Sequence, residues 1–372
     1  MGNQIIKMIH RTKKSEVANY YDNDNLSQSK IKLLLSNVNL YNAVTQTDLY
    51  YNEKTHFVIG SAVDCWITEG EEVFDNTYYI SKLGKKPSDV VMSIVEEVFD
   101  KIEKNEVKSL DNYFDLIKNS CNSHNYYDNR LDESKVNTLV KQGKDYFNEL
   151  RNSNKRQILS EEEYKLIKDI SENLLTNEYT KKYFEDSVGK DIIYQLPLYF
   201  KYCGVECKAL LDMVIIDHFK KEIILCDIKT LGDYTSNFPK SSNKRRYDIQ
   251  AAFYIQALIE SGSKVESIIS KSIEGYKVVG FRFIVESTLS PGNPLVFKVV
   301  PDLLIMGKLG RPHVTFSKKE IPPSGIQFNK IPGFEYGISL YKWYQEHGFE
   351  TEKIISINEG ELEFDWYGII EN

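Results

Sequence analysis

Three apolar runs between residues 191 and 231 constrain the fold of this chain more strongly than any other feature. They read DIIYQLPLYFKYC, CKALLDMVIID and KEIILCDIKTL, and turn-forming residues separate them. Short runs rich in β-branched and aromatic residues predict three consecutive strands. The third run is interrupted by Asp227 and Lys229. Because an uncompensated buried charge is strongly unfavourable, this acid and this base need a physical explanation.

The surrounding pattern predicts an α+β protein with a mixed central sheet flanked by helices. Before the strands, helices are predicted over 26–36, with Ser27 or Ser29 as N-cap, over Gly60–Thr68, and through much of 87–185. Ser160 and Glu163 form a capping-box pattern in that last stretch. After the strands come a helix at 247–261, two further strands and a late helix in 333–348.

The domain organisation follows from the same reading. We expect a polar N-terminal arm at 1–25, a helical N-terminal region at 26–190, and a core with C-terminal elements at 191–372. No linker separates the last two, so we expect them to form one structural domain.

Composition limits the class of protein. Hydrophobic residues make up 41% of the chain and charged residues 27%, which is typical of globular proteins. The formal net charge of −7 argues against an extensively basic surface, although a local basic groove is enough to bind nucleic acid. The five cysteines are odd in number and lie mostly in apolar runs, which favours a cytoplasmic protein without a zinc or iron–sulfur site. No 18-residue apolar window is present, so we expect no membrane span.

Asp227 and Lys229 are expected to share a strand face, because side chains alternate along a strand. Asp212 lies in the preceding strand, and a hairpin between the two strands would place it beside Asp227. Two adjacent carboxylates repel each other unless a cation lies between them, and Mg²⁺ is commonly held by one or two carboxylates with water and phosphate oxygens. Lys229 would then face the attacking water or the scissile phosphate. The alternative is a set of surface salt bridges on ordinary strands, because Asp-x-Lys by itself is common.

The predicted helix at 247–261 adds to this constellation. Gln250 and Tyr254 are four residues apart and share a helix face. A basic cluster precedes them in sequence, made of Lys240, Lys244, Arg245 and Arg246. An acidic metal site beside basic residues suits a phosphodiester substrate. The alternatives are routine helix packing for Gln250 and Tyr254, and a solvated loop for the basic cluster.

Taken in order, these residues resemble the PD-(D/E)xK nuclease superfamily. Within it they are most similar to the RecE-like exonucleases of phages and prophages, relatives of the RecB nuclease domain. The resemblance rests on Asp212, Asp227-Ile228-Lys229, and Gln250 with Tyr254. It extends to the N-terminal half, where NLSQSKIKLLLSNVNLY and IGSAVDCWITEGEEVFDNTYYI resemble the helices that open the family's domain.

Two positions depart from the family's pattern. Asp64 stands where the family usually has a metal-ligating His, and an Asp oxygen is also an acceptable ligand for Mg²⁺ or Mn²⁺. His56 is a weaker substitute for that ligand. Gln195 stands where a Glu is often found, with either a structural role or a role in tuning the site.

The resemblance implies a Mg²⁺- or Mn²⁺-dependent exonuclease that processes double-stranded DNA ends for recombination in the cytoplasm, or in the host cytoplasm if a phage encodes it. The implied catalytic residues are Asp212, Asp227, Lys229, Gln250 and Tyr254, and the implied metal ligands are Asp64, Asp212 and Asp227. It also implies a single-strand annealing protein as a partner and a homo-oligomer. A sequence- or structure-specific endonuclease of the same fold is one alternative. An inactive DNA-binding or assembly protein is another, and Asp64 is its best argument.

Overall fold

The computed structural model describes residues 8–46, 55–84, 86–102, 109–311, 331–348, 363–365 and 368–370. The chain forms two compact units. One unit comprises residues 70–169, and the other comprises the segments on either side of it. Within the described ranges, no helix is both long and apolar enough to cross a membrane.

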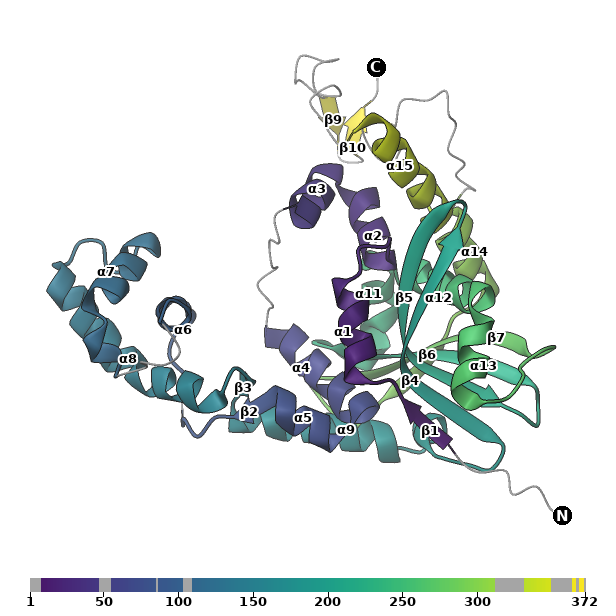
Figure 1. Cartoon of the computed structure of the whole chain (residues 1–372), viewed down its shortest axis with the longest axis horizontal. Helices are drawn as coiled ribbons and strands as arrows, with labels where there is room; N and C mark the ends of the chain where they lie inside the picture. Colours follow the sequence, from purple (N-terminus) through teal and green to yellow (C-terminus); the bar gives the residue numbers. More distant parts are fainter. Residues whose placement is uncertain are drawn as a thin grey trace. The chain divides into compact units, whose positions relative to one another are not determined.

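The larger unit is built on a six-stranded mixed sheet with the order β1-β4-β5-β6-β7-β8. β1 is parallel to β4 and β6 is parallel to β7, whereas the other neighbours are antiparallel. The strands are β1 (Met8–Arg11), β4 (Lys190–Tyr202), β5 (Val205–Asp217), β6 (Glu222–Leu231), β7 (Lys277–Ser287) and β8 (Leu295–Lys298). Figure 1 shows β4, β5 and β6 side by side as consecutive hairpins.

The β4–β5 hairpin closes through the two residues Cys203 and Gly204, whose φ angles are 50° and 82°. Two positive φ angles are what a type I′ turn requires, and this turn matches the right-handed twist of paired strands. The turn therefore fixes the register of β4 against β5.

Helices surround this sheet. The central one is α12, which packs on β4, β5 and β7 and also contacts α2 and α14. α2 in turn packs against α15, and α4 packs against β6. Their bounds are α1 (Lys14–Asp22), α2 (Gln28–Ser36), α3 (Val38–Gln46), α4 (Thr55–Asp64), α10 (Lys181–Phe184), α11 (Phe238–Lys244), α12 (Tyr247–Glu260), α13 (Gly262–Ile269), α14 (Pro301–Leu309) and α15 (Phe334–His347). A π-helical turn (Cys65–Glu69), a 3₁₀ turn (Thr235–Asn237) and the short hairpin of β9 (Glu363–Asp365) and β10 (Gly368–Ile370) complete the unit.

One apolar core joins the sheet to α12. Phe253 from α12, Leu198 from β4 and Phe283 from β7 are among its buried members. The core also takes in Ile31 from α2 and Phe334 from α15. The helices near the two ends of the chain thus belong to the same core as the central strands.

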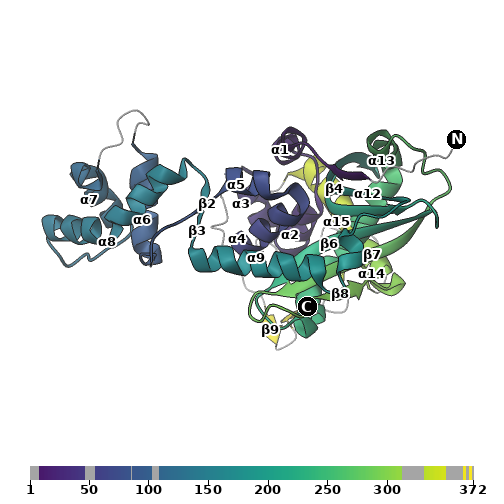
Figure 2. The same cartoon turned by 90° about the horizontal axis from the view of Figure 1, so that it is seen from below.

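The smaller unit is mainly helical. Figure 2 shows α6 (Asp89–Asp100), α7 (Phe114–Ser123) and α8 (Asp132–Ser153) grouped together, and they share a core of residues that includes Val95, Ile117 and Phe147. A 3₁₀ turn (Leu110–Asn112) also belongs to this unit, as do α5 (Glu71–Thr77) and the short parallel pair of β2 (Tyr78–Ile80) and β3 (Gln157–Leu159). α9 (Glu161–Thr176) runs across the boundary at residue 169.

The predicted α+β class with a mixed sheet is confirmed. The predicted caps are also present: Ser27 Oγ accepts from Lys30 N, and Ser160 and Glu163 bond reciprocally as a capping box. The boundaries differ from expectation. The units divide at 69/70 and 169/170 rather than at 25/26 and 190/191, because α2 and α4 pack against α12 and β6. Residues 8–22, expected in a loose arm, contribute β1 and α1, since β1 pairs with β4 far along the chain.

Candidate active site

Asp212 and Asp227 lie where the pairing of β5 with β6 ends. The last paired residues are Met213 and Cys226, and the same register continued by one step places Asp212 opposite Asp227. From Asp227 onward β6 continues its pairing with β7. Beyond the last β5–β6 pair, a carboxylate oxygen of Asp212 accepts a hydrogen bond of 3.4 Å from the backbone N–H of Ile228. The predicted side-by-side placement of the two carboxylates is therefore present at an opening in the sheet.

Asp227 is held from two directions. Its side chain is fully buried, and Gln250 Nε2 on α12 donates to its Oδ1 over 2.6 Å. Lys229 Nζ forms an ion pair with Oδ2 over 2.5 Å. The Lys229 side chain is 22% exposed, so it connects this buried carboxylate to solvent. An ordinary surface salt bridge would not bury its acid in this way.

The charges of the site perturb one another. Burial is the main cause that raises the pKa of Asp212 well above its usual value, and the neighbouring carboxylates of Asp227 and Asp64 raise it further. Burial alone would lower the pKa of Lys229, but Asp227 and Asp212 outweigh it and raise that pKa. Asp212 therefore holds its proton to a higher pH than an isolated carboxyl group, because the site brings carboxyl groups together in a buried place.

Asp64 reaches the site from the end of α4, just before the π-helical turn. α4 approaches β6 closely at Gly60, where a Cβ atom would lie 2.9 Å from Thr230 Oγ1. Burial, followed by nearby acidic groups, raises the pKa of Asp64 to about 7, against an opposing effect of Lys229. Its Oδ2 accepts a hydrogen bond of 2.7 Å from Gln195 Nε2, whereas no described residue donates to its buried Oδ1.

Gln195 occupies an irregular point in β4. Its φ is 52°, although its neighbours Tyr194 and Leu196 pair regularly with Met213 and Leu211. The register places Gln195 opposite Asp212, at the one gap in this ladder of described residues. A left-handed non-glycine residue costs on the order of 1–3 kcal/mol and is often found at functional sites.

The residues present fit a divalent cation. Among the described residues, the buried Oδ1 of Asp64 accepts no hydrogen bond, and buried polar atoms of this kind usually have a partner. Within the described residues, no three His, Cys, Asp or Glu side chains form a ready metal cage. Mg²⁺ does not need such a cage, because two carboxylates with water and substrate oxygens suffice. Asp212 and Asp227 are the stronger candidate ligands and Asp64 is a candidate third. The side chain of His56 lies outside the described part of the structure.

α12 brings both of its predicted residues to the site. Gln250 and Tyr254 are buried, at 5% and 7% exposure. Burial raises the pKa of Tyr254 well above its usual value, and Asp212 and Asp227 add to this effect. Both side chains are therefore near the two carboxylates, and Tyr254 stays protonated there at any ordinary pH.

The predicted basic cluster is divided by the structure. Lys240 and Lys244 are exposed one turn apart on α11, and Arg245 is exposed directly after them. Arg246 differs, because it is paired with Asp248 at 2.9 Å and donates to the carbonyl of Pro332 over 2.7 Å. Three of the four cations are thus open to a ligand, whereas Arg246 joins the start of α12 to the chain before α15.

Sequence reasoning missed several residues at this site. Lys32 on α2 lies with its Nζ 5.6 Å from the centre of the Tyr247 ring, and Lys229 Nζ lies 5.4 Å from the same ring. Burial, followed by the nearby charge of Lys229, lowers the pKa of Lys32 to about 8. Tyr20 on α1 is also close, since Asp212 is among the groups that raise its pKa after burial. The helical spacing around Lys32 gave no signal for this convergence, because it depends on tertiary packing.

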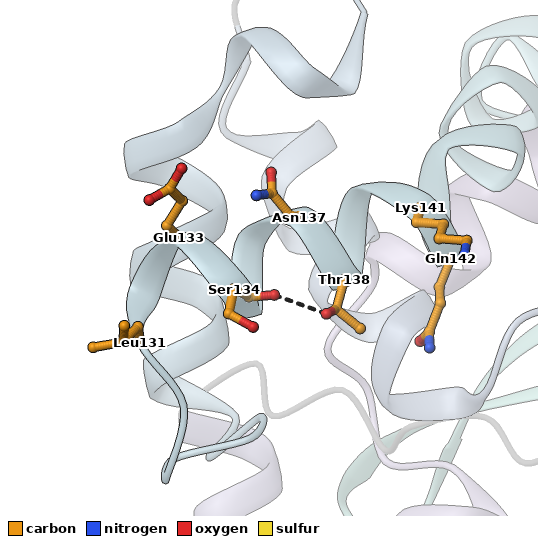
Figure 3. Close-up of a pocket in the computed structure, with 7 residues that line it drawn as sticks. All are labelled: Leu131, Glu133, Ser134, Asn137, Thr138, Lys141 and Gln142. Carbon is orange, nitrogen blue, oxygen red and sulfur yellow. Dashed lines mark hydrogen bonds between the residues drawn. The ribbon is translucent and has the colours of Figure 1, made fainter.

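A surface pocket lies in the other unit. It is lined by residues of α8 and the residue before it, and Figure 3 shows these side chains along one helix, where Thr138 Oγ1 donates to the carbonyl of Ser134. The lining residues are Leu131, Glu133, Ser134, Asn137, Thr138, Lys141 and Gln142. None of the predicted site residues belongs to it.

The mixed sheet, the two opposed aspartates and the Asp-x-Lys strand beside a Gln-bearing helix define a PD-(D/E)xK-type domain. A comparison with protein families agrees: residues 27–271 match the family described as "PDDEXK-like domain of unknown function (DUF3799)". The chain belongs to this family. Membership of this family supports a nuclease function for the chain.

Among solved structures, the chain is similar to a crystal structure of a "Putative exonuclease" from Eubacterium rectale. The TM-score is 0.39 and the sequence identity is 12%, over 79% of this chain and 80% of that one. The comparison with curated proteins found no match.

Proposed function

We propose that this protein is a metal-dependent DNA exonuclease that hydrolyses phosphodiester bonds at double-stranded ends. The single observation that carries the proposal is the buried Asp227, opposed by Asp212 and paired with Lys229 where the pairing of β5 with β6 ends. Membership of a PDDEXK-like family supports the nuclease part. The preference for ends, and a role in recombination with an annealing protein and further copies of this chain, rest on the resemblance of the motifs.

The proposed roles follow from the contacts. A bound Mg²⁺ or Mn²⁺ would supply Lewis acidity for the phosphodiester, held by Asp212 and Asp227 with Asp64 beside them. Lys229 orients the attacking water and offsets negative charge that develops on the phosphate. Gln250 fixes the orientation of the Asp227 carboxylate through its 2.6 Å bond.

The DNA backbone would be bound by basic residues of the larger unit. Lys240, Lys244 and Arg245 are exposed on one short segment before α12, and Lys32 lies beside Lys229. Such contacts need no sequence specificity, because phosphate is the same at each nucleotide. A net negative protein can bind DNA through a local surface of this kind.

The test is to incubate the protein with linear and with covalently closed circular DNA, in Mg²⁺, Mn²⁺ or EDTA. We expect the protein to degrade linear DNA but not closed circular DNA. This degradation should occur with Mg²⁺ or Mn²⁺ and not in EDTA. Cleavage of the closed circle would indicate an endonuclease of the same fold. Binding without cleavage of either DNA would indicate an inactive DNA-binding or assembly protein, and hydrolysis that persists in EDTA would exclude the metal.

A further inference from the structure

Gln195 is attached to Asp64 by a hydrogen-bond arrangement with a fixed direction. Its Nε2 donates to Asp64 Oδ2 over 2.7 Å and to Thr68 Oγ1 over 3.1 Å. The Thr68 hydroxyl uses its own proton to donate to the backbone carbonyl of Asp64 over 2.8 Å. Both neighbours of the Gln195 amide are therefore acceptors, and only the NH₂ end of the amide satisfies them.

This arrangement leaves the two oxygens of Asp64 in different states. Oδ2 is occupied by Gln195, whereas Oδ1 is buried and has no hydrogen-bond partner in the described part of the chain. A buried carboxylate oxygen without a donor is unfavourable unless a cation compensates it. The irregular backbone of Gln195, with its φ of 52°, brings the amide to this position from the middle of β4.

We propose that Gln195 is a positioning residue that holds Asp64 with its free oxygen available as a third ligand to the cation, and that a hydrogen-bond donor is required at this position. The proposal rests on the proposed function, because it assumes a cation at Asp212 and Asp227. Partners behind a metal ligand orient it and set its basicity. An Asp ligand needs a donor behind it, whereas a His ligand needs an acceptor for its second ring N–H.

This chemistry makes residues 64 and 195 exchangeable only as a pair. Gln195→Glu places a carboxylate against the Asp64 carboxylate in a buried position, where two like charges repel. The same Glu behind a His at position 64 would accept the ring N–H and orient it. Gln195→Met retains the length of the side chain but donates nothing, so it removes the hydrogen bonds without adding charge.

The experiment measures Mn²⁺ affinity by isothermal titration for the wild type, Gln195→Glu, Gln195→Met, Asp64→His and the double variant Asp64→His with Gln195→Glu. We expect Gln195→Glu and Gln195→Met to weaken Mn²⁺ binding by about 10–100-fold, the usual effect of removing a partner behind a ligand. The double variant should bind at least as tightly as Asp64→His alone. Unchanged affinity in Gln195→Met, or a double variant as weak as Gln195→Glu, would overturn the proposal.

A second measurement does not depend on the metal. In EDTA above pH 7, where Asp64 is ionised, Gln195→Glu should lower the midpoint of thermal unfolding in the wild-type background. It should have a much smaller effect in an Asp64→Asn background, because the repelling charge is then absent. An equal shift of the unfolding midpoint in both backgrounds would contradict the contact between residues 64 and 195. If the wild type binds no Mn²⁺, the proposed function fails and the positioning role fails with it. If the wild type binds Mn²⁺ and the Gln195 variants bind equally well, the positioning role alone fails.

Discussion

Gln250 on α12 donates its side-chain N–H to the buried carboxylate of Asp227 on β6. This bond joins the central helix to the strand that carries the Asp-x-Lys motif, and it occupies one of the two Asp227 oxygens. The other oxygen is paired with Lys229. The orientation of Asp227 is therefore set before any ligand arrives, which is the arrangement that catalysis requires.

Variants of α12 should separate turnover from metal binding. Gln250→Ala frees the Asp227 carboxylate to rotate, so we expect turnover to fall by about 10–100-fold, with a smaller loss of Mn²⁺ affinity. Tyr254→Phe should lower turnover without changing metal affinity. Single-turnover kinetics and isothermal titration measure the two effects. Gln256→Ala on the same helix is the matched control, and a parallel loss of metal binding in Tyr254→Phe would place Tyr254 among the ligands.

Substitution of either of the two opposed aspartates should abolish hydrolysis. Asp212→Asn and Asp227→Asn each remove a candidate ligand but preserve the shape of the side chain, so we expect folded proteins without hydrolytic activity. Asp217→Asn, at the far end of β5, is the control and should cleave normally. Circular dichroism checks the fold. Near-normal cleavage by both site variants would contradict their assignment.

The metal-free protein should lose stability as pH rises from about 4 to about 7. The Asp64 pKa is raised from 3.8 to about 7 in the folded protein, mainly by burial. The native state then binds more protons than the unfolded state over this interval, and one such group changes the free energy of unfolding by about 1.4 kcal/mol per pH unit. Denaturant titrations in EDTA should show this slope, and Asp64→Asn should reduce it. An unchanged slope in Asp64→Asn would show that Asp64 is not the titrating group.

Lys32 should give DNA affinity a dependence on pH. Its pKa is lowered to about 8, mainly by burial, so it loses its charge as pH rises from 7 to 9. We expect wild-type affinity for DNA to fall over this range. Lys32→Arg should remain tight, because Arg keeps its charge. Lys30→Arg on the same helix is the control and should behave as the wild type does. Equal pH dependence in all three proteins would exclude Lys32 from the DNA contact.

Much of the core could be predicted from sequence because its signals are local. β-branched runs identified β4, β5 and β6, and hairpin pairing then placed Asp212 beside Asp227. Helical spacing was enough to place Gln250 and Tyr254 on α12. The contacts that were missed are between distant segments. Gln195 meets Asp64 through an irregularity inside β4, and no residue pattern indicates a left-handed residue in a β-branched run.

The basic residues show the same limit. Lys240, Lys244, Arg245 and Arg246 looked equivalent in sequence, yet Arg246 is the one of these four that pairs with Asp248. Lys32 precedes them by about two hundred residues and still lies beside Lys229. The parallel pairing of β1 with β4 was also hidden, since a four-residue strand carries little pattern of its own.

The most direct test of the nuclease account is single-turnover cleavage by Lys229→Ala at saturating DNA, measured together with DNA affinity against salt. We expect affinity near that of the wild type and a cleavage rate lower by about 10²–10⁴-fold, because one positioned catalytic group is lost. A variant that replaces Lys240, Lys244 and Arg245 should show the reverse: weaker binding, a flatter salt dependence by about one unit of slope per lost phosphate contact, and intact chemistry at saturation. If Lys229→Ala cleaves at the wild-type rate on saturating DNA, the Asp227–Lys229 pair is a structural ion pair and the account is contradicted.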